Sequence, residues 1–245
     1  MTDRWSDPQP PARVERPMLF QAWRDCAFLH WSFPPEVVRP RVPANYELDT
    51  FDGRAWVSLI AFEIAHMHPG RSLPAVPGLS SALEAHLRTY VRGPDGRRGI
   101  WMLSIEMAPL QAALLGRFGF ALPYWWADMD VTSGTEAARY RSRRRSPAGP
   151  ALSLDLRLGD PIPATELEEL DHFVTARWVL YSGFGPISAS ILVEHAPWEL
   201  RRAEVLSHDQ DLLSMAGLPT REPDRIHFSP GVDALLAWPR ISLAG

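Results

Sequence analysis

The sequence predicts a mainly β fold with a few short helices (α+β), built as one domain. About ten short runs rich in aromatic and aliphatic residues are separated by Gly, Pro, Asn and Asp, as in strands joined by turns. Few segments have the apolar spacing of a helix. No repeat and no Gly/Ser linker interrupts the middle of the 245-residue chain. We therefore expect a closed or strongly curved sheet in a single domain over residues 18–245.

The composition supports a packed, cytoplasmic protein. Hydrophobic residues make up 46% of the chain and there are ten tryptophans, which is enough for a substantial core. Residues 1–17 are polar and proline-rich, so we expect a flexible leader there. No signal core or membrane-spanning apolar run is present. The single cysteine, Cys26, cannot form an internal disulfide, which fits a reducing compartment.

The first half of the chain predicts two hairpins around a short helix. Pro34-Pro35-Glu36 suits the first turn of a helix that ends near residues 40–43. Asp52-Gly53 is a favourable hairpin turn, and the alternation from Leu83 to Val91 has the two-residue period of a half-buried strand. The expected strands are residues 23–33, 46–51, 54–65, 83–91 and 100–107.

The rest of the chain adds more strands and three short helices. Leucines alternate with polar residues over 152–158, a strong strand pattern. Thr165 and Glu168 match a capping box before a helix with an apolar stripe. The other expected helices are 109–118 and 209–216, and the other expected strands are 122–131, 135–145, 178–181, 188–194, 198–206 and 226–238.

All 25 basic residues counted as Lys or Arg are arginine. Arginine stays protonated and is not an amine nucleophile, so no side chain of this chain can form a Schiff base with a carbonyl compound. Chemistry that depends on a lysine is therefore excluded.

Several segments, in order along the chain, resemble the DUF2071 (YqjF-like) family. They are Phe28-Leu-His-Trp31, Leu48-Asp-Thr-Phe-Asp-Gly-Arg-Ala-Trp56, Glu84-Ala-His-Leu-Arg-Thr-Tyr-Val91, Gly99-Ile-Trp101, Leu122-Pro-Tyr124, Tyr140-Arg-Ser-Arg143, Arg177-Trp-Val-Leu-Tyr181, His195-Ala-Pro-Trp198 and Ser229-Pro-Gly-Val-Asp233. The resemblance implies an acetoacetate decarboxylase-like fold, a closed β-barrel around a central pocket. True acetoacetate decarboxylases use a lysine that this chain lacks, so the resemblance implies fold better than function.

The polar face of residues 84–90 offers the leading binding residues. Glu84, His86, Arg88 and Tyr90 share one face of a strand and point together into a pocket or into solvent. Arg88 could hold a carboxylate through two parallel hydrogen bonds. Tyr90, His30 and Trp101, which lie in the segments that resemble the family, are further substrate-binding candidates.

Four residues are candidates for catalysis. Glu106 lies in an apolar run, where burial would raise its pKa into the range of a general acid or base; the alternative is a structural ion pair with Arg88. Glu84 is a second carboxylate for proton transfer. Tyr124 or His195 could stabilise an enolate, although aromatic clusters and buried histidines are more often structural.

The sequence does not predict a metal, a cofactor or a nucleic acid partner. His66 and His68 have no apparent third ligand, and the arginines of residues 139–145 stand in a chain of net charge −4. We expect an acid/base enzyme acting on a small carboxylated or carbonyl metabolite by isomerisation, dehydration, cyclisation or Schiff-base-independent decarboxylation. The alternative is a non-catalytic protein that binds a ligand in the same cavity. A homo-oligomer is left open.

Overall fold

The structure is a computed structural model that describes residues 8–70, 73–75, 78, 80–145, 147–184 and 187–243. Within these residues, fourteen strands form one sheet. The strands are β1 Pro17–Phe33, β2 Glu47–Leu48, β3 Thr50–Phe51, β4 Arg54–Pro69, β5 Ala82–Arg92, β6 Arg98–Ala108, β7 Tyr124–Ser133, β8 Ala137–Arg144, β9 Ala151–Pro161, β10 Val179–Phe184, β11 Ile187–His195, β12 Arg201–Gln210, β13 Arg225–Ala237 and β14 Arg240–Leu243.

The helices are short, as the sequence predicts. They are α1 Pro35–Val38, α2 Leu110–Phe120, α3 Glu169–Thr175 and α4 Leu212–Met215, with 3₁₀ turns η1 Arg39–Arg41 and η2 Ala164–Glu166. No helix among the described residues is long and apolar enough to cross a membrane. The mainly β prediction is confirmed.

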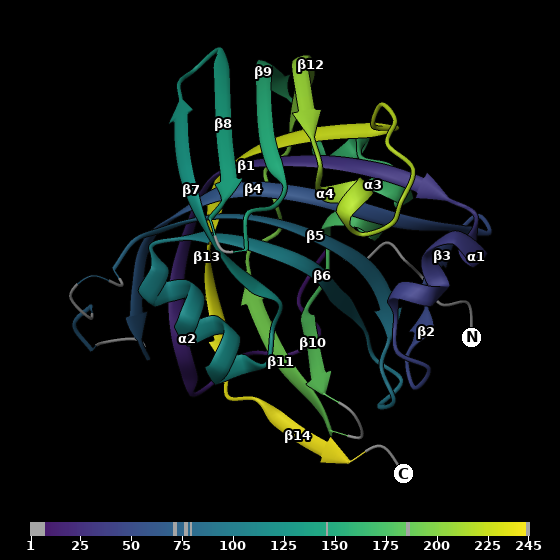
Figure 1. The fold of residues 1–245 in the computed structure, drawn as a ribbon, viewed down its shortest axis with the longest axis vertical. Helices are drawn as coiled ribbons and strands as arrows, with labels where there is room; N and C mark the ends of the chain where they lie inside the picture. Colours follow the sequence, from purple (N-terminus) through teal and green to yellow (C-terminus); the bar gives the residue numbers. More distant parts are fainter. Residues whose placement is uncertain are drawn as a thin grey trace.

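The strand pairings close into two rings that share a wall. The smaller ring runs β1–β4–β5–β6–β10–β11–β13 and closes where β11 pairs with β13. The larger ring leaves β6 through β7, β8, β9 and β12 and returns to β13. In Figure 1, β7, β8, β9 and β12 lie above the shared strands, and β10 and β11 lie below them.

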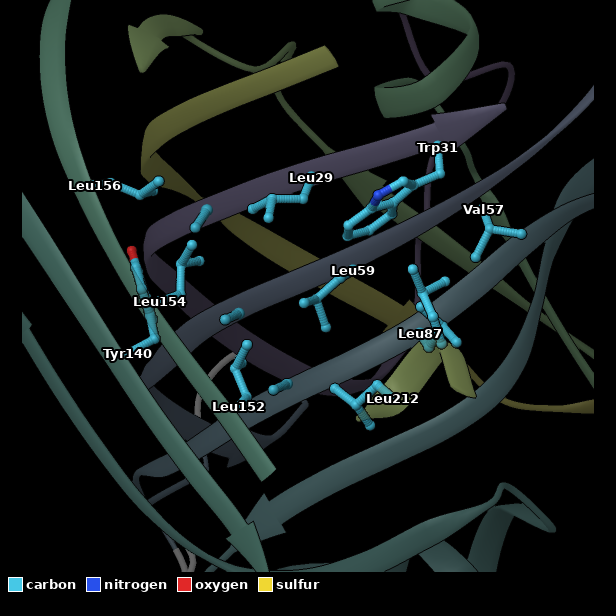
Figure 2. Close-up of a cluster of buried hydrophobic side chains, with 14 of the residues drawn as sticks. Leu29, Trp31, Val57, Leu59, Leu87, Tyr140, Leu152, Leu154, Leu156 and Leu212 are labelled. Carbon is cyan, nitrogen blue, oxygen red and sulfur yellow. The ribbon is translucent and has the colours of Figure 1, made fainter. Parts of the chain in front are cut away.

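Strand alternation gives the shared wall two buried faces. Leu29, Leu59 and Leu87 point into the larger ring, where they pack against Tyr140 and Leu154 (Figure 2). This core is apolar, and burying it supplies much of the free energy that stabilises the fold. The residues next to these leucines along each strand point the other way, into the smaller ring.

Turn chemistry explains the hairpins. Asp52 and Gly53 both have positive φ angles, +48° and +71°, between β3 and β4. Two such residues match the twist of antiparallel strands, so the predicted hairpin is confirmed. The hairpin between β5 and β6 is also present.

Two local predictions need correction. The helix near residue 170 is capped by Glu168 rather than Thr165, since the Asp171 carboxylate accepts a hydrogen bond from the Glu168 backbone N–H at 2.8 Å; Thr165 lies in η2. Within the expected leader, Val14 is buried and its N–H donates to the Glu194 carboxylate. Residues 1–7 of that leader lie outside the described residues.

Candidate functional site

The smaller ring encloses a cavity. Its volume is about 90 Å³, several times what one water molecule needs. The wall is apolar apart from a few side chains, most of them on β5. The lining residues are Gln21, Trp23, Cys26, Phe28, Ile60, Phe62, Glu84, His86, Arg88, Ile100, Met102, Tyr124, Leu180, Val193, Trp198 and Leu236.

The polar face of β5 points into this cavity rather than into solvent. Glu84, His86 and Arg88 line it and are only 6%, 5% and 8% exposed. Their neighbours Ala85 and Leu87 pack into the core of the larger ring. The apolar side of the strand thus has its own buried partner, which is why the charged side is also buried.

Glu84, His86 and Tyr124 form a connected group. The His86 Nδ1 lies 2.7 Å from Glu84 Oε1, and the Tyr124 hydroxyl lies 3.5 Å from Glu84 Oε2. Since the carboxylate accepts from Nδ1–H, Nε2 of the neutral ring keeps a free lone pair. His86 Nε2 is buried without a hydrogen-bond partner.

Burial sets the protonation states of this group. It lowers the pKa of His86, and the hydrogen bond to Glu84 opposes that change. Burial, reinforced by the Glu84 carboxylate, raises the pKa of Tyr124 well above its usual range. At neutral pH the site therefore holds a neutral imidazole as an acceptor and a protonated phenol as a donor.

Arg88 is a buried cation, and no carboxylate of the described residues pairs with it. Its Nη2 donates to the Val174 carbonyl oxygen at 3.0 Å, and its Nε has no hydrogen-bond partner. The two other buried arginines of the described chain are ion-paired, Arg144 with Glu106 and Arg177 with Asp49. An uncompensated buried charge is costly, so the wall at Arg88 favours an anion.

Glu106 is outside the cavity. The Arg144 guanidinium donates to both carboxylate oxygens, at 2.9 Å and 2.5 Å, and the Ser104 hydroxyl donates at 2.8 Å. The predicted ion pair with Arg88 is wrong, because the partner is Arg144 from β8. Glu106 is not among the residues that line the cavity, and its carboxylate accepts from Arg144 and Ser104 instead.

The remaining predicted residues are also outside the lining. Trp101 lies on the opposite face of β6 and packs against Tyr46, with ring centroids 5.0 Å apart. The His195 ring lies among tryptophans, with the Trp178 centroid 4.5 Å away, and burial lowers its pKa to about 4. Tyr90 and His30 belong to a buried hydrogen-bonded chain that is described below.

His86 and the apolar wall of the cavity are functional features that the sequence does not single out. His86 was recognisable only as a member of the alternating strand face. Trp23, Phe62 and Trp198 come from three separate parts of the chain, and only the closed ring brings them together. No pattern within any one segment predicts their meeting.

Several charged groups on the outer strands are paired with one another. Among the described residues, no group of three or more His, Cys, Asp or Glu side chains is arranged to hold a metal ion. On the outer strands, Arg139 and Arg141 pair with Asp155, and Arg145 pairs with Asp128. Much of the basic charge of β8 is thus balanced locally.

Comparison with known proteins gives the family. The family model DUF2071, described as an uncharacterized conserved protein, matches residues 20–233. The chain belongs to the DUF2071 family. YqjF of Bacillus subtilis (strain 168) is 33% identical over 224 residues, which cover 91% of each chain.

Solved structures show that this DUF2071 chain has an acetoacetate decarboxylase-like fold. The acetoacetate decarboxylase of Legionella pneumophila matches 98% of this chain and 94% of its own, with a TM-score of 0.62 and 11% identity. An acetoacetate decarboxylase-like enzyme of Sphingomonas wittichii RW1 gives 0.65 and 11%, covering 95% and 96%. The enduracididine biosynthesis enzyme MppR, complexed with pyruvate, gives 0.59 and 12%, covering 92% and 90%. At these identities the likeness concerns the fold alone.

Proposed function

We propose that the central cavity binds a small carboxylate that carries a carbonyl group, and that the protein acts on it by acid/base chemistry. The observation that carries this proposal is Arg88, a buried guanidinium on the cavity wall that pairs with no carboxylate in the part of the chain that the structure describes. A ligand carboxylate would supply the missing negative charge through charge-assisted hydrogen bonds. The fold is one in which MppR has been crystallised with pyruvate, a 2-oxo acid.

The neighbouring residues suit proton transfer at carbon. His86 lies two residues from Arg88 on the same strand face, roughly 7 Å along the strand, so its Nε2 would meet an atom close to the carboxylate. His86 takes a proton from the carbon next to the carbonyl, and Glu84 holds the ring in the tautomer with Nε2 free. The Tyr124 hydroxyl donates to the carbonyl oxygen as the enolate forms.

This chemistry proceeds without a Schiff base, since the chain has no lysine. The enolate is the shared intermediate of the proposed reaction classes. Isomerisation, dehydration and cyclisation reach it by loss of a proton from carbon, and decarboxylation of a 3-oxo acid reaches it when the C–C bond breaks and CO₂ leaves. Catalysis depends on the tautomer of His86 and on the phenol of Tyr124, rather than on a covalent adduct.

The anion site is tested by calorimetric titration with pyruvate and phenylpyruvate. Arg88→Gln should weaken binding by about 2–5 kcal/mol, because it removes the charge that the carboxylate needs. Arg143→Gln is the matched control, since Arg143 is exposed on β8. Equal affinity of the Arg88→Gln variant and the wild type would overturn the proposed anion site.

The acid/base role is tested by following exchange of the pyruvate methyl protons with D₂O by NMR. We expect exchange with the wild type, and its loss in His86→Gln while pyruvate still binds. Binding that depends on Arg88, with no exchange in the wild type, would instead favour the second candidate, a non-catalytic binding protein. The apolar wall of Trp23, Phe62 and Trp198 also suits such a protein.

A further inference from the structure

A buried chain of side chains connects the outside of the molecule with the neighbourhood of Arg88. The Asp171 Oδ1 lies 3.0 Å from His227 Nε2, and His227 Nδ1 lies 3.4 Å from His30 Nε2. The His30 Nδ1 lies 2.6 Å from Ser58 Oγ, which lies 2.5 Å from the Tyr90 hydroxyl. All five side chains are at most 1% exposed.

The two ends of the chain face different surroundings. At the outer end, Asp171 and His227 line a surface groove, and Arg225 donates to both oxygens of Asp171 at 2.8 Å. At the inner end, the Tyr90 hydroxyl and Arg88 Nη2 contact the same acceptor, the Val174 carbonyl oxygen, at 2.7 Å and 3.0 Å. The chain therefore runs from the groove to the proposed anion site.

With both imidazole rings neutral, the chain has four hydrogens for five contacts, counting the contact between Tyr90 and the Val174 carbonyl. In one arrangement, Tyr90 donates to Ser58, Ser58 donates to His30 Nδ1, His30 Nε2–H donates to His227 Nδ1, and His227 Nε2–H donates to the Asp171 carboxylate. The 2.7 Å contact between the Tyr90 hydroxyl and the Val174 carbonyl then holds no hydrogen, and Arg88 alone donates to that carbonyl.

A second arrangement holds one more proton and places a hydrogen in all five contacts. His227 is then an imidazolium that donates through Nε2 to Asp171 and through Nδ1 to His30. Nδ1–H of His30 donates to Ser58, Ser58 donates to Tyr90, and Tyr90 donates to the Val174 carbonyl. One proton taken up from the groove reverses the other hydrogen bonds, and no heavy atom has to move.

The charges around the imidazole rings of His30 and His227 decide which arrangement is populated. Asp171 on α3 favours the proton, whereas Arg225 on β13 and Arg88 on β5 oppose it; Ser58 on β4 and Tyr90 on β5 contribute hydroxyl groups. Burial lowers the pKa of His30 well below its usual range, and the charges of His227 and Arg88 lower it further. An anion bound at Arg88 would cancel one of these opposing charges.

We propose that the chain Asp171–His227–His30–Ser58–Tyr90 is a proton site coupled to the cavity, so that an anion binding at Arg88 draws one proton into the chain from the outer groove. The inference rests on the proposed function for its anion site. By linkage, the proton then strengthens anion binding as much as the anion strengthens proton binding. Affinity for the anion should rise as pH falls, by up to about tenfold per pH unit where one proton is taken up.

The coupling can be tested without any ligand. Histidine ring NMR signals are titrated with pH in the wild type and in Arg88→Gln, which removes the opposing charge. We expect the pH at which the His30 ring signals change, as its hydrogen moves between Nε2 and Nδ1, to rise by about one unit in the variant, and Arg143→Gln to leave it in place. Unchanged pH dependence of the His30 signals in a folded Arg88→Gln protein overturns the proposal, whether or not any carboxylate binds.

The ligand-linked proton is measured by titrating pyruvate calorimetrically in buffers of different ionisation enthalpy. We expect proton uptake in the wild type and in His86→Gln, and its loss in His227→Gln with binding retained. Zero uptake in the wild type contradicts the coupling. So does uptake that persists in His227→Gln and disappears in His86→Gln, because the proton would then reside on His86. Absence of pyruvate binding would count against the proposed function, and the NMR titration would still decide the coupling.

Discussion

The three buried arginines show how one residue type takes different roles according to its partner. Arg144 and Arg177 each contact a carboxylate, so each charge is neutralised inside the protein. Arg88 donates to a backbone carbonyl, whose dipole does not neutralise a full charge. A structural ion pair and an anion site are therefore distinguished by the group opposite the guanidinium, which no sequence pattern around Arg88 reveals.

At the residue scale, Glu106→Gln should destabilise the protein by about 3–5 kcal/mol, because it leaves the buried charge of Arg144 without its partner. Urea denaturation measures this cost. Glu204→Gln is the matched control, since its pair with Arg157 is exposed and is worth no more than about 1 kcal/mol.

A double variant separates the cost of leaving one buried charge unpaired from the contribution of the ion pair itself. Replacing Glu106 and Arg144 together by methionine removes both charges, and it should recover much of the stability that Glu106→Gln loses. If Glu106→Gln costs no more than Glu204→Gln, the ion pair does not contribute as the burial of its groups indicates.

At the element scale, a single β-bulge explains why Glu106 does not line the cavity, where the sequence predicts it. Arg88 pairs with Met102, but Leu87 pairs with Ser104, so Leu103 is an extra residue in β6. A one-residue shift moves the following side chains to the opposite face of the sheet. In a regular hairpin Glu106 would pair with Glu84 and point to the same face of the sheet, toward the cavity. In the structure it pairs with Ala85 and points to the opposite face.

Features that depend on neighbouring residues could be predicted from the sequence. The hairpin turn at Asp52-Gly53 and the alternation of β5 are of this kind, and both are present. The sequence does not decide the direction of the polar face of β5, because that depends on which of the two strand rings each face meets. The contacts of Trp101 and His195 depend in the same way on strands far apart in the chain.

Helix α2 provides a prediction at this scale. A Cβ added at Gly116 would lie 2.4 Å from the Tyr124 ring, whereas one added at Gly119 would meet only Leu115, at 3.7 Å. Gly116→Ala should therefore cost about 1–3 kcal/mol and displace Tyr124 from Glu84. Gly119→Ala should be neutral or stabilising by up to about 1 kcal/mol.

Urea denaturation and the aromatic NMR signals of Tyr124 measure both effects in the Gly116→Ala and Gly119→Ala proteins. The two glycines lie three residues apart on one helix, so a general effect on helix propensity would act on both alike. Equal stability of the two variants would show that α2 does not depend on close packing at Gly116.

At the scale of the whole molecule, the two rings share β1, β4, β5, β6 and β13. The shared wall separates an apolar core on one side from the cavity on the other, so both faces of these strands are shielded from solvent. The cavity keeps its shape because its polar strand, β5, is supported from behind by Leu87 and Ala85 in the larger ring. Core packing and binding therefore meet in the same strands, on opposite faces.

This arrangement predicts how the protein opens. Freeing an amide of β4 requires both rings to open, whereas β14 is an edge strand that pairs only with β11 among the described strands. Hydrogen exchange followed by mass spectrometry should show the slowest exchange in β1, β4 and β5, near the free energy of global unfolding, about 5–15 kcal/mol. Strands of only one ring, such as β8 and β10, should exchange faster, and β14 fastest. Exchange in β8 as slow as in β4 would contradict this prediction. It would mean that the larger ring and the shared wall open together, and that the shared strands are no more stable against opening than the other strands of that ring.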